Sequence, residues 1–204
     1  MTVEQKVVGV VQEAPPKAAG SAIGNPAPLG LMCFGLTTIT LCMMNAGLIQ
    51  ATAFGAVVAM AVFYGGVAQI FAGWMEFHKG NTFAGTAFTS FGFFWILFMA
   101  ILLLPTLGLT PAVDGKSVGA LLFVWGLFVT YMFIGTLPKP RAFQVIFGTA
   151  ALLFFLVAAA EYTGNADIKT IGGYEGIICG FSAFYLAMAE ILNEAYGKKI
   201  LPIG

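Results

Sequence analysis

Few side chains in this sequence could do covalent chemistry, and they lack the partners that catalysis requires. His78 is the only histidine, and Cys33, Cys42 and Cys179 do not have metal-ligand spacing. No glycine-rich segment precedes a phosphate-binding lysine. Haem ligation, a histidine-rich iron site, a serine–histidine protease site and a nucleotide loop are therefore all incomplete. We expect no enzyme activity, no metal, no cofactor and no nucleic-acid partner.

Hydroxyl and amide side chains recur at helical spacing inside apolar segments. Residues three, four and seven apart share one face of a helix, so these groups line up and can hydrogen-bond a small solute. Serine and threonine also bond their own backbone, and amides also bridge helices. For Asn45 and Gln69 the sequence leaves pore lining and interhelical bonding equally open. The residues that we expect to bind solute are Thr37, Thr38, Asn45, Tyr64, Gln69 and Ser90.

Charged side chains avoid the centres of the same segments. None of the segments contains Lys or Arg, and the glutamates, Glu175 among them, are expected toward segment ends. A solute carboxylate must then be bound by hydroxyls, amides and backbone N–H groups, which implies weak binding suited to rapid passage. Three polar residues lie near the C-terminal ends of their segments: Glu76, Glu190 and Asn193. The sequence leaves open whether these residues relay a proton or anchor the helix ends.

Six long apolar segments must position these residues. The chain has 204 residues, of which 59% are apolar and only 9% are charged, far from the composition of a soluble protein. A helix of about 20 apolar residues crosses a hydrocarbon core of about 30 Å. Because the segments are apolar at nearly every position, alternating barrel strands are excluded. The expected spans of this all-α integral membrane protein are residues 28–48, 54–76, 83–104, 118–137, 142–161 and 171–196.

Basic residues orient the expected spans. An even number of spans puts both termini on one side, which carries seven Lys and Arg residues against two, Lys116 and Lys169, on the other. Cytoplasmic loops carry the excess of Lys and Arg, so we expect both termini in the cytoplasm. We also expect the protein to lie in a plasma membrane. Residues 1–24 are polar and rich in Ala, Gly and Pro, which predicts a disordered cytoplasmic tail. Residues 25–204 then form one six-helix transmembrane transport domain.

Several short motifs follow one another in a recognisable order. They are NPAPLGL at residues 25–31, FYGG at 63–66, QIFAG at 69–73, GNTF at 80–83, AFTS at 87–90, and LAMAE at 186–190. Together they resemble the acetate uptake transporter family, which includes the bacterial succinate-acetate permeases, from residue 25 to the C-terminus. The resemblance implies a homohexameric ring with six helices and one solute path per subunit. It also implies acetate as the common substrate, with succinate accepted by some members.

The same resemblance implies where the path narrows. Members of the family narrow it with an aromatic residue on the first helix, a Tyr on the third and a Leu on the fifth, and the matching positions here are Phe34, Phe91 and Ala150. Phe91 lacks the phenolic hydroxyl, and Ala150 leaves space that Leu would fill. We therefore expect larger solutes such as lactate or succinate to pass, unless Phe147 or Phe181 fills the gap.

The function expected from the sequence is a permease for acetate and similar small carboxylates, embedded in the lipid bilayer. An aromatic constriction would favour the neutral acid or a briefly dehydrated anion, because a carboxylate is costly to bring into apolar surroundings. Proton-coupled symport and an anion channel both remain open. The alternatives are a channel for another small solute such as ammonium, and a structural or signalling membrane subunit without transport activity.

Overall fold

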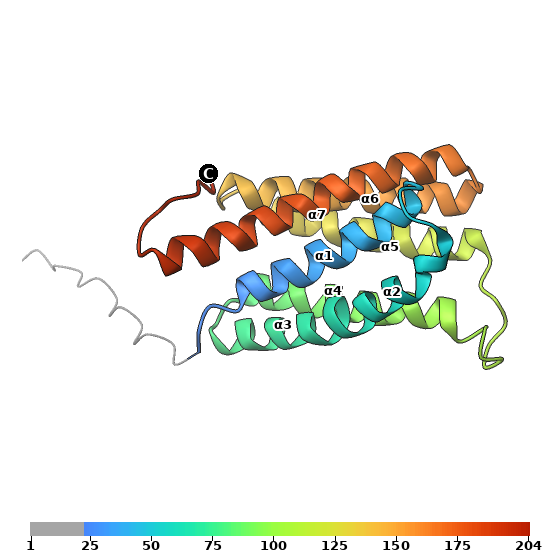
Figure 1. The fold of residues 1–204 in the computed structure, drawn as a ribbon, viewed down its shortest axis with the longest axis horizontal. Helices are drawn as coiled ribbons and strands as arrows, with labels where there is room; N and C mark the ends of the chain where they lie inside the picture. Colours follow the sequence, from blue (N-terminus) through green and yellow to red (C-terminus); the bar gives the residue numbers. More distant parts are fainter. Residues whose placement is uncertain (1–22) are drawn as a thin grey trace, which may run out of the picture.

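The computed structural model describes residues 23–204, and these are helical apart from short connections (Figure 1). Six helical rods in this part of the chain are long and apolar enough to cross a membrane, and it contains no strand. The prediction of an all-α protein with six spans is thus confirmed. The tail expected over residues 1–24 lies outside the described residues except for its last two.

The helix boundaries follow the prediction closely. The second rod, Ala51–His78, is composite: a short 3₁₀ turn, α2, a π-helical segment and α3 follow one another without a break. Only the last helix differs by more than three residues, because it begins at residue 166 rather than 171. The elements are α1 (Ala27–Asn45), α2 (Phe54–Ala59), the π-helical segment (Met60–Ala68), α3 (Gln69–His78), α4 (Thr82–Leu103), α5 (Gly115–Ile134), α6 (Arg141–Thr163) and α7 (Ala166–Ala195).

Side-chain caps explain where several helices begin. The Asn165 carboxamide oxygen accepts hydrogen bonds from the backbone N–H of Asp167 at 2.8 Å and of Ile168 at 3.2 Å, which starts α7 early. At the start of α5, Ser117 donates from its backbone N–H and its hydroxyl to the Asp114 carboxylate, at 3.0 and 2.6 Å. These two bonds hold the pKa of the Asp114 carboxyl below its ordinary value.

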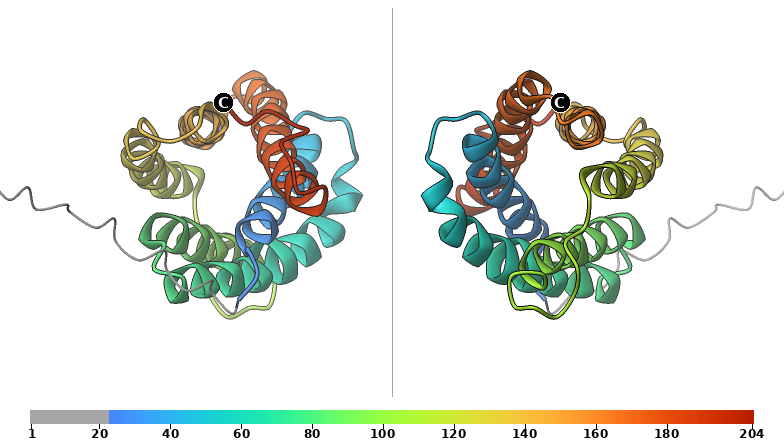
Figure 2. Two further views of the ribbon diagram at one scale, coloured as in Figure 1. Left: turned by 90° about the vertical axis from the view of Figure 1, so that its left-hand side faces the viewer. Right: turned by 90° about the vertical axis from the view of Figure 1, so that its right-hand side faces the viewer.

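The rods form a ring when the bundle is seen end-on (Figure 2). Helix α1 packs against α7, α7 against α6, and α6 against α5; the π-helical segment lies between α1 and α4, and α3 packs on α4. Glycines allow α1 and α7 to approach closely: a Cβ atom added to Gly180 would lie 2.7 Å from the carbonyl oxygen of Gly35. Such a close approach is typical of small residues at helix contacts in membranes.

Both ends of the described chain lie at the same end of the bundle (Figure 1). The last residues return to the start of α6, where the backbone N–H of Ala142 donates to the carbonyl oxygen of Ile203 at 3.1 Å. The other end of the bundle carries the loop between α4 and α5 and the tight connection between α6 and α7. The first of these is called the terminal end of the bundle, and the second the opposite end.

Candidate functional site

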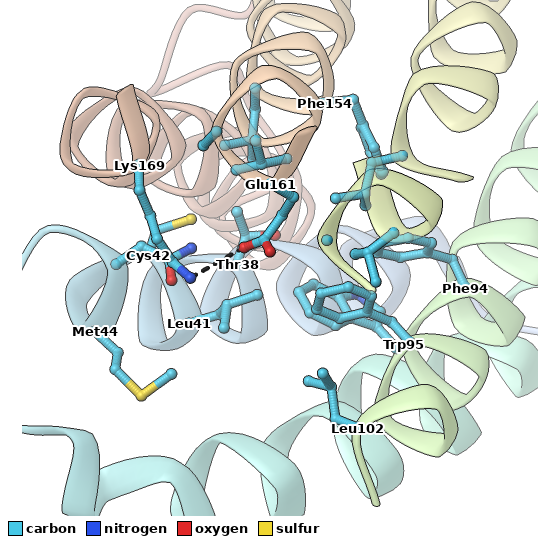
Figure 3. Close-up of a pocket in the computed structure, with 18 of the residues that line it drawn as sticks. Thr38, Leu41, Cys42, Met44, Phe94, Trp95, Leu102, Phe154, Glu161 and Lys169 are labelled. Carbon is cyan, nitrogen blue, oxygen red and sulfur yellow. Dashed lines mark hydrogen bonds and ion pairs between the residues drawn. The ribbon is translucent and has the colours of Figure 1, made fainter. Parts of the chain in front are cut away.

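A cavity of about 450 Å³, here called the wide cavity, lies toward the opposite end of the bundle (Figure 3). Its position follows from its lining, which includes Asn45, the last residue of α1, and Gly115, the first of α5. Most of the lining is apolar and aromatic, including Phe94 and Trp95 of α4 and Phe154 of α6. Its volume falls within the range typical of small-molecule sites.

A second cavity, the narrow cavity, has a volume of about 20 Å³. That space is enough for about one water molecule. Phe34 of α1 is the one described residue that lines both cavities, so its side chain forms a wall between them. The complete lining of the narrow cavity is Leu31, Phe34, Gln69, Ala87, Phe88, Phe91, Ile146, Phe147 and Ala150.

The three residues expected to form the constriction lie together around the narrow cavity. The ring centroids of Phe34 and Phe91 are 5.0 Å apart with the planes tilted by 47°. Ala150 of α6 is buried and lines the same cavity. The Phe91 ring also lies 6.3 Å from those of Phe147 and Phe154, within the range of favourable aromatic contacts. Four aromatic rings from three helices therefore occlude the centre of the bundle.

The two residues considered as fillers of the space beside Ala150 lie in different places. Phe147 is 6% exposed and lines the narrow cavity with Ala150. Phe181, in contrast, is 55% exposed and faces away from the bundle. Phe147 is therefore the residue that occupies the space next to Ala150.

Two of the expected solute-binding residues present unpartnered polar atoms beside these cavities. Gln69 lines the narrow cavity; its Nε2 donates to the carbonyl oxygen of Gly30 at 3.2 Å, while its Oε1 is enclosed and has no partner. Thr38 lines the wide cavity, and its hydroxyl oxygen is likewise enclosed without a partner. Buried polar atoms without partners are unusual, and a bound solute or water can satisfy them.

The remaining expected solute-binding residues lie in different settings. Asn45 lines the wide cavity, whereas Tyr64 and Ser90 line neither cavity. Tyr64 instead lies beside the thiol of Cys33. Thr37 is fully buried, and its hydroxyl makes a long bond of 3.5 Å to the carbonyl oxygen of Met60, the first residue of the π-helical segment.

A polar network closes the terminal end of the bundle. The Asn25 carboxamide donates to Glu190 Oε2 at 3.1 Å and accepts from Lys79 Nζ at 3.1 Å. Lys79 Nζ also lies 3.7 Å from Oε1 of Glu76, which is fully buried, and Glu76 Oε2 accepts from Asn81 Nδ2 at 2.8 Å. The network ties the start of α1 to the ends of α3 and α7.

Asn193 holds the segment that follows α7. Its Oδ1 accepts from the backbone N–H groups of Ile200 and Leu201 at 2.7 and 2.9 Å, and its Nδ2 donates to the carbonyl oxygen of Leu201 at 2.9 Å. All of its hydrogen bonds that the structure gives are to backbone, and they fix the path of the C-terminal residues.

Sequence reasoning missed several residues that line the wide cavity. Trp95 follows Phe91 by four positions on α4, and Phe154 follows Ala150 by four positions on α6, so helical spacing could have found both. Sequence reasoning also placed Glu175 too close to a helix end. Because α7 begins at Ala166, Glu175 lies well inside the span, with both carboxylate oxygens enclosed and unpartnered.

Six membrane-crossing helices around two cavities parted by aromatic rings define a multi-pass membrane transport protein. The chain belongs to the GPR1/FUN34/yaaH family, whose sequence profile matches residues 9–200. It is 52% identical over 182 residues to the succinate-acetate/proton symporter SatP of Escherichia coli (strain K12), covering 89% of this chain and 96% of that protein. A solved structure of the bacterial acetate channel SatP, 52% identical, matches with a TM-score of 0.86 over 89% of this chain and 99% of that chain.

A eukaryotic relative is also similar over most of this chain. The ammonia transport outward protein 2 of Saccharomyces cerevisiae (strain ATCC 204508 / S288c) is 40% identical over 176 residues, which are 83% of this chain and 62% of the relative. The family therefore includes proteins whose names refer to different small solutes.

Proposed function

We propose that this protein is a plasma-membrane permease for acetate and similar small carboxylates. The observation that carries the proposal is the position of Phe34, which forms a wall of both cavities and meets Phe91 at a centroid distance of 5.0 Å. A solute that passes from the wide cavity to the narrow one must move these rings. The names of the SatP relatives support a small carboxylate as that solute.

The chemistry of the rings selects for small, weakly hydrated solutes. A carboxylate loses much of its hydration between aromatic rings, whereas the protonated acid loses less, so the neutral acid or a briefly dehydrated anion passes. On the wide side, the Thr38 hydroxyl donates to the solute carboxyl group. On the narrow side, the free Oε1 of Gln69 accepts from the hydroxyl of a neutral acid. Asn45 adds polarity on the wide side. A solute-binding role for Thr37, Tyr64 and Ser90, which line neither cavity, stays a prediction.

We assign the acidic residues at the terminal end to anchoring rather than to proton relay. Glu190 and Glu76 each accept a hydrogen bond from an asparagine and lie in one network with Lys79. Asn193 bonds backbone groups of the C-terminal segment. Substituting Glu190 by Gln keeps the bond to Asn25 and should leave the pH dependence of uptake unchanged. A changed pH dependence would reverse the assignment to a relay.

We also propose that both termini face the cytoplasm and that six copies assemble into a ring. Lys79, Arg141 and Lys198 lie at the terminal end of the bundle, which supports a cytoplasmic location for that end. Large apolar side chains such as Phe63 and Phe71 are more than half exposed and are suited to contact lipid or neighbouring subunits. Thiol labelling of a cysteine placed after Gly204 in intact cells tests the first point, and native mass spectrometry tests the second.

Ammonium transport is the second candidate, and the name of the yeast relative favours it. Aromatic faces such as those of Phe34 and Phe91 attract cations. Competition separates the two solutes: excess ammonium at constant pH should leave acetate uptake unchanged if carboxylates are the substrate. Inhibition of uptake would favour a shared or cationic substrate.

A pair of substitutions distinguishes transport from a purely structural role. If Asn45 and Gln69 serve the path, replacing both by Leu should reduce acetate flux at least about tenfold per folded molecule, because their hydrogen bonds to solute are lost. Replacing Gln50, an exposed glutamine outside the helices, by Leu is the matched control. If the double variant lowers only the folded yield, with unchanged flux per molecule, the packing role is correct and the transport role is wrong.

A further inference from the structure

Lys169 and Glu161 are the two charged residues among the described residues that line the wide cavity. Lys169 lies in the first turns of α7, and Glu161 lies in the last turn of α6, so the two face each other across the short α6–α7 connection. Lys169 Nζ lies 3.0 Å from Glu161 Oε1, and Figure 3 shows this ion pair beside Cys42 and Thr38. An otherwise uncharged cavity thus has one cation and one anion at its mouth.

The ion pair is partly exposed, because the two side chains retain 48% and 32% of their accessible surface. Exposed pairs of this kind contribute little to stability, and their members exchange partners readily. A cation at the mouth of a cavity with apolar walls also raises the local concentration of anions, because the low-dielectric walls focus its field. Lys169 therefore meets any small anion before the aromatic rings do.

We propose that Lys169 is a docking site for the carboxylate group of the solute, and that Glu161 is a tethered competitor for the same ammonium group. The inference rests on the proposed function, since it concerns the anion that this path takes up. Glu161 and acetate carry the same functional group, so an arriving solute replaces Glu161 at Nζ without changing the type of bond. The competition keeps the docking weak, and the solute moves on to Thr38.

The two partners should have opposite effects on transport, which a structural tie between α6 and α7 would not produce. Glu161→Gln frees Lys169 and should lower the half-saturating concentration of acetate about two- to fivefold. Lys169→Gln leaves Glu161 unpaired at the mouth, where it repels anions, and should raise that concentration about two- to fivefold. Lys169→Arg keeps the positive charge, so its half-saturating concentration of acetate should equal that of the wild-type protein.

The experiment measures acetate flux into proteoliposomes of the purified full chain over a range of acetate concentrations, at low and at high salt. Lys116→Gln is the matched control, because Lys116 also lies at the opposite end of the bundle but does not line the cavity. The expected result is opposite shifts for Glu161→Gln and Lys169→Gln, which shrink at high salt because exposed charges are screened. Unchanged values, or shifts in the same direction, would overturn the docking role. Absence of flux in the wild-type protein would instead refute the proposed function itself.

Discussion

Phe34 of α1 and Phe91 of α4 meet with their ring centroids 5.0 Å apart, at the boundary between the wide and the narrow cavity. Each ring is nearly inaccessible to solvent. Helix α1 packs most extensively on α7 and α4 on α3, and both also contact the π-helical segment. The width of the path between the two cavities therefore depends on how closely these two rings meet.

Removing the Phe34 ring should reduce discrimination between small carboxylates. Phe34→Ala opens the wall between the two cavities, so the ratio of acetate to lactate uptake should fall about tenfold, the effect that one well-packed methyl-sized contact has on specificity. Labelled uptake of both acids gives the ratio. The control is Phe181→Ala, which removes an equal ring from the exposed outer face. An equal change in both variants would contradict a gating role for Phe34.

Adding bulk at position 150 should have the opposite effect. Ala150 is 1% exposed beside the narrow cavity, so the branches of a Leu side chain must displace Phe147 or enter the path. Ala150→Leu should therefore reduce lactate and succinate uptake more than acetate uptake. Ala59→Leu, at an exposed alanine of α2, controls for added apolar surface. Unchanged discrimination would show that residue 150 does not set the width.

Packing between α1 and α7 depends on the absence of a side chain at Gly180. A Leu at this position would collide with the Gly35 carbonyl oxygen and with Ile39, so Gly180→Leu should destabilise the protein by about 1–3 kcal/mol or more. Thermal unfolding of the purified protein in detergent measures the change. Gly55 of α2 has open space around its Cα, so Gly55→Ala should not destabilise it. If the Gly180→Leu variant were as stable as the wild-type protein, the close contact between Gly180 and Gly35 would be refuted.

The unpartnered carboxyl group of Glu175 should reduce stability. Both of its oxygens are enclosed inside the α7 span, and the nearby thiols of Cys42 and Cys179 provide no strong hydrogen bond. Glu175→Leu removes the unsatisfied group and should stabilise the protein by about 1–3 kcal/mol. Asp167→Asn, at an exposed carboxylate on the same helix, is the control. A lower unfolding temperature for Glu175→Leu would mean that this carboxyl group has a partner in the membrane.

The six spans could be predicted because the bilayer itself sets their length, and long apolar runs leave no other structure. The start of α7 was predicted too late, since a side-chain cap from Asn165 to the backbone moved it, and a hydropathy pattern does not contain that information. The π-helical segment, Met60–Ala68, has no sequence signature that distinguishes it from an α-helix. Local hydrogen bonding decided both features.

The site was predictable only in part. The grouping of Phe34, Phe91 and Ala150 came from family resemblance, because three residues on three helices share no sequence spacing. The ion pair of Glu161 and Lys169 was missed, although opposite charges flanking a short connection between antiparallel helices are a usable signal. The free oxygen of Gln69 depends on the bond that its Nε2 makes to Gly30, a contact between distant segments that only the fold determines.

Transport of acetate by this protein is tested by uptake of labelled acetate into proteoliposomes that hold the purified protein. The assay is run with and without an inward proton gradient, with the membrane potential clamped, and with the leak of acetic acid into protein-free liposomes subtracted. A permease should give uptake well above the leak. Acceleration by the proton gradient indicates symport, and flux that follows the acetate gradient and voltage alone indicates a channel. Uptake no greater than in protein-free liposomes would contradict a transport role and favour a structural role for the protein.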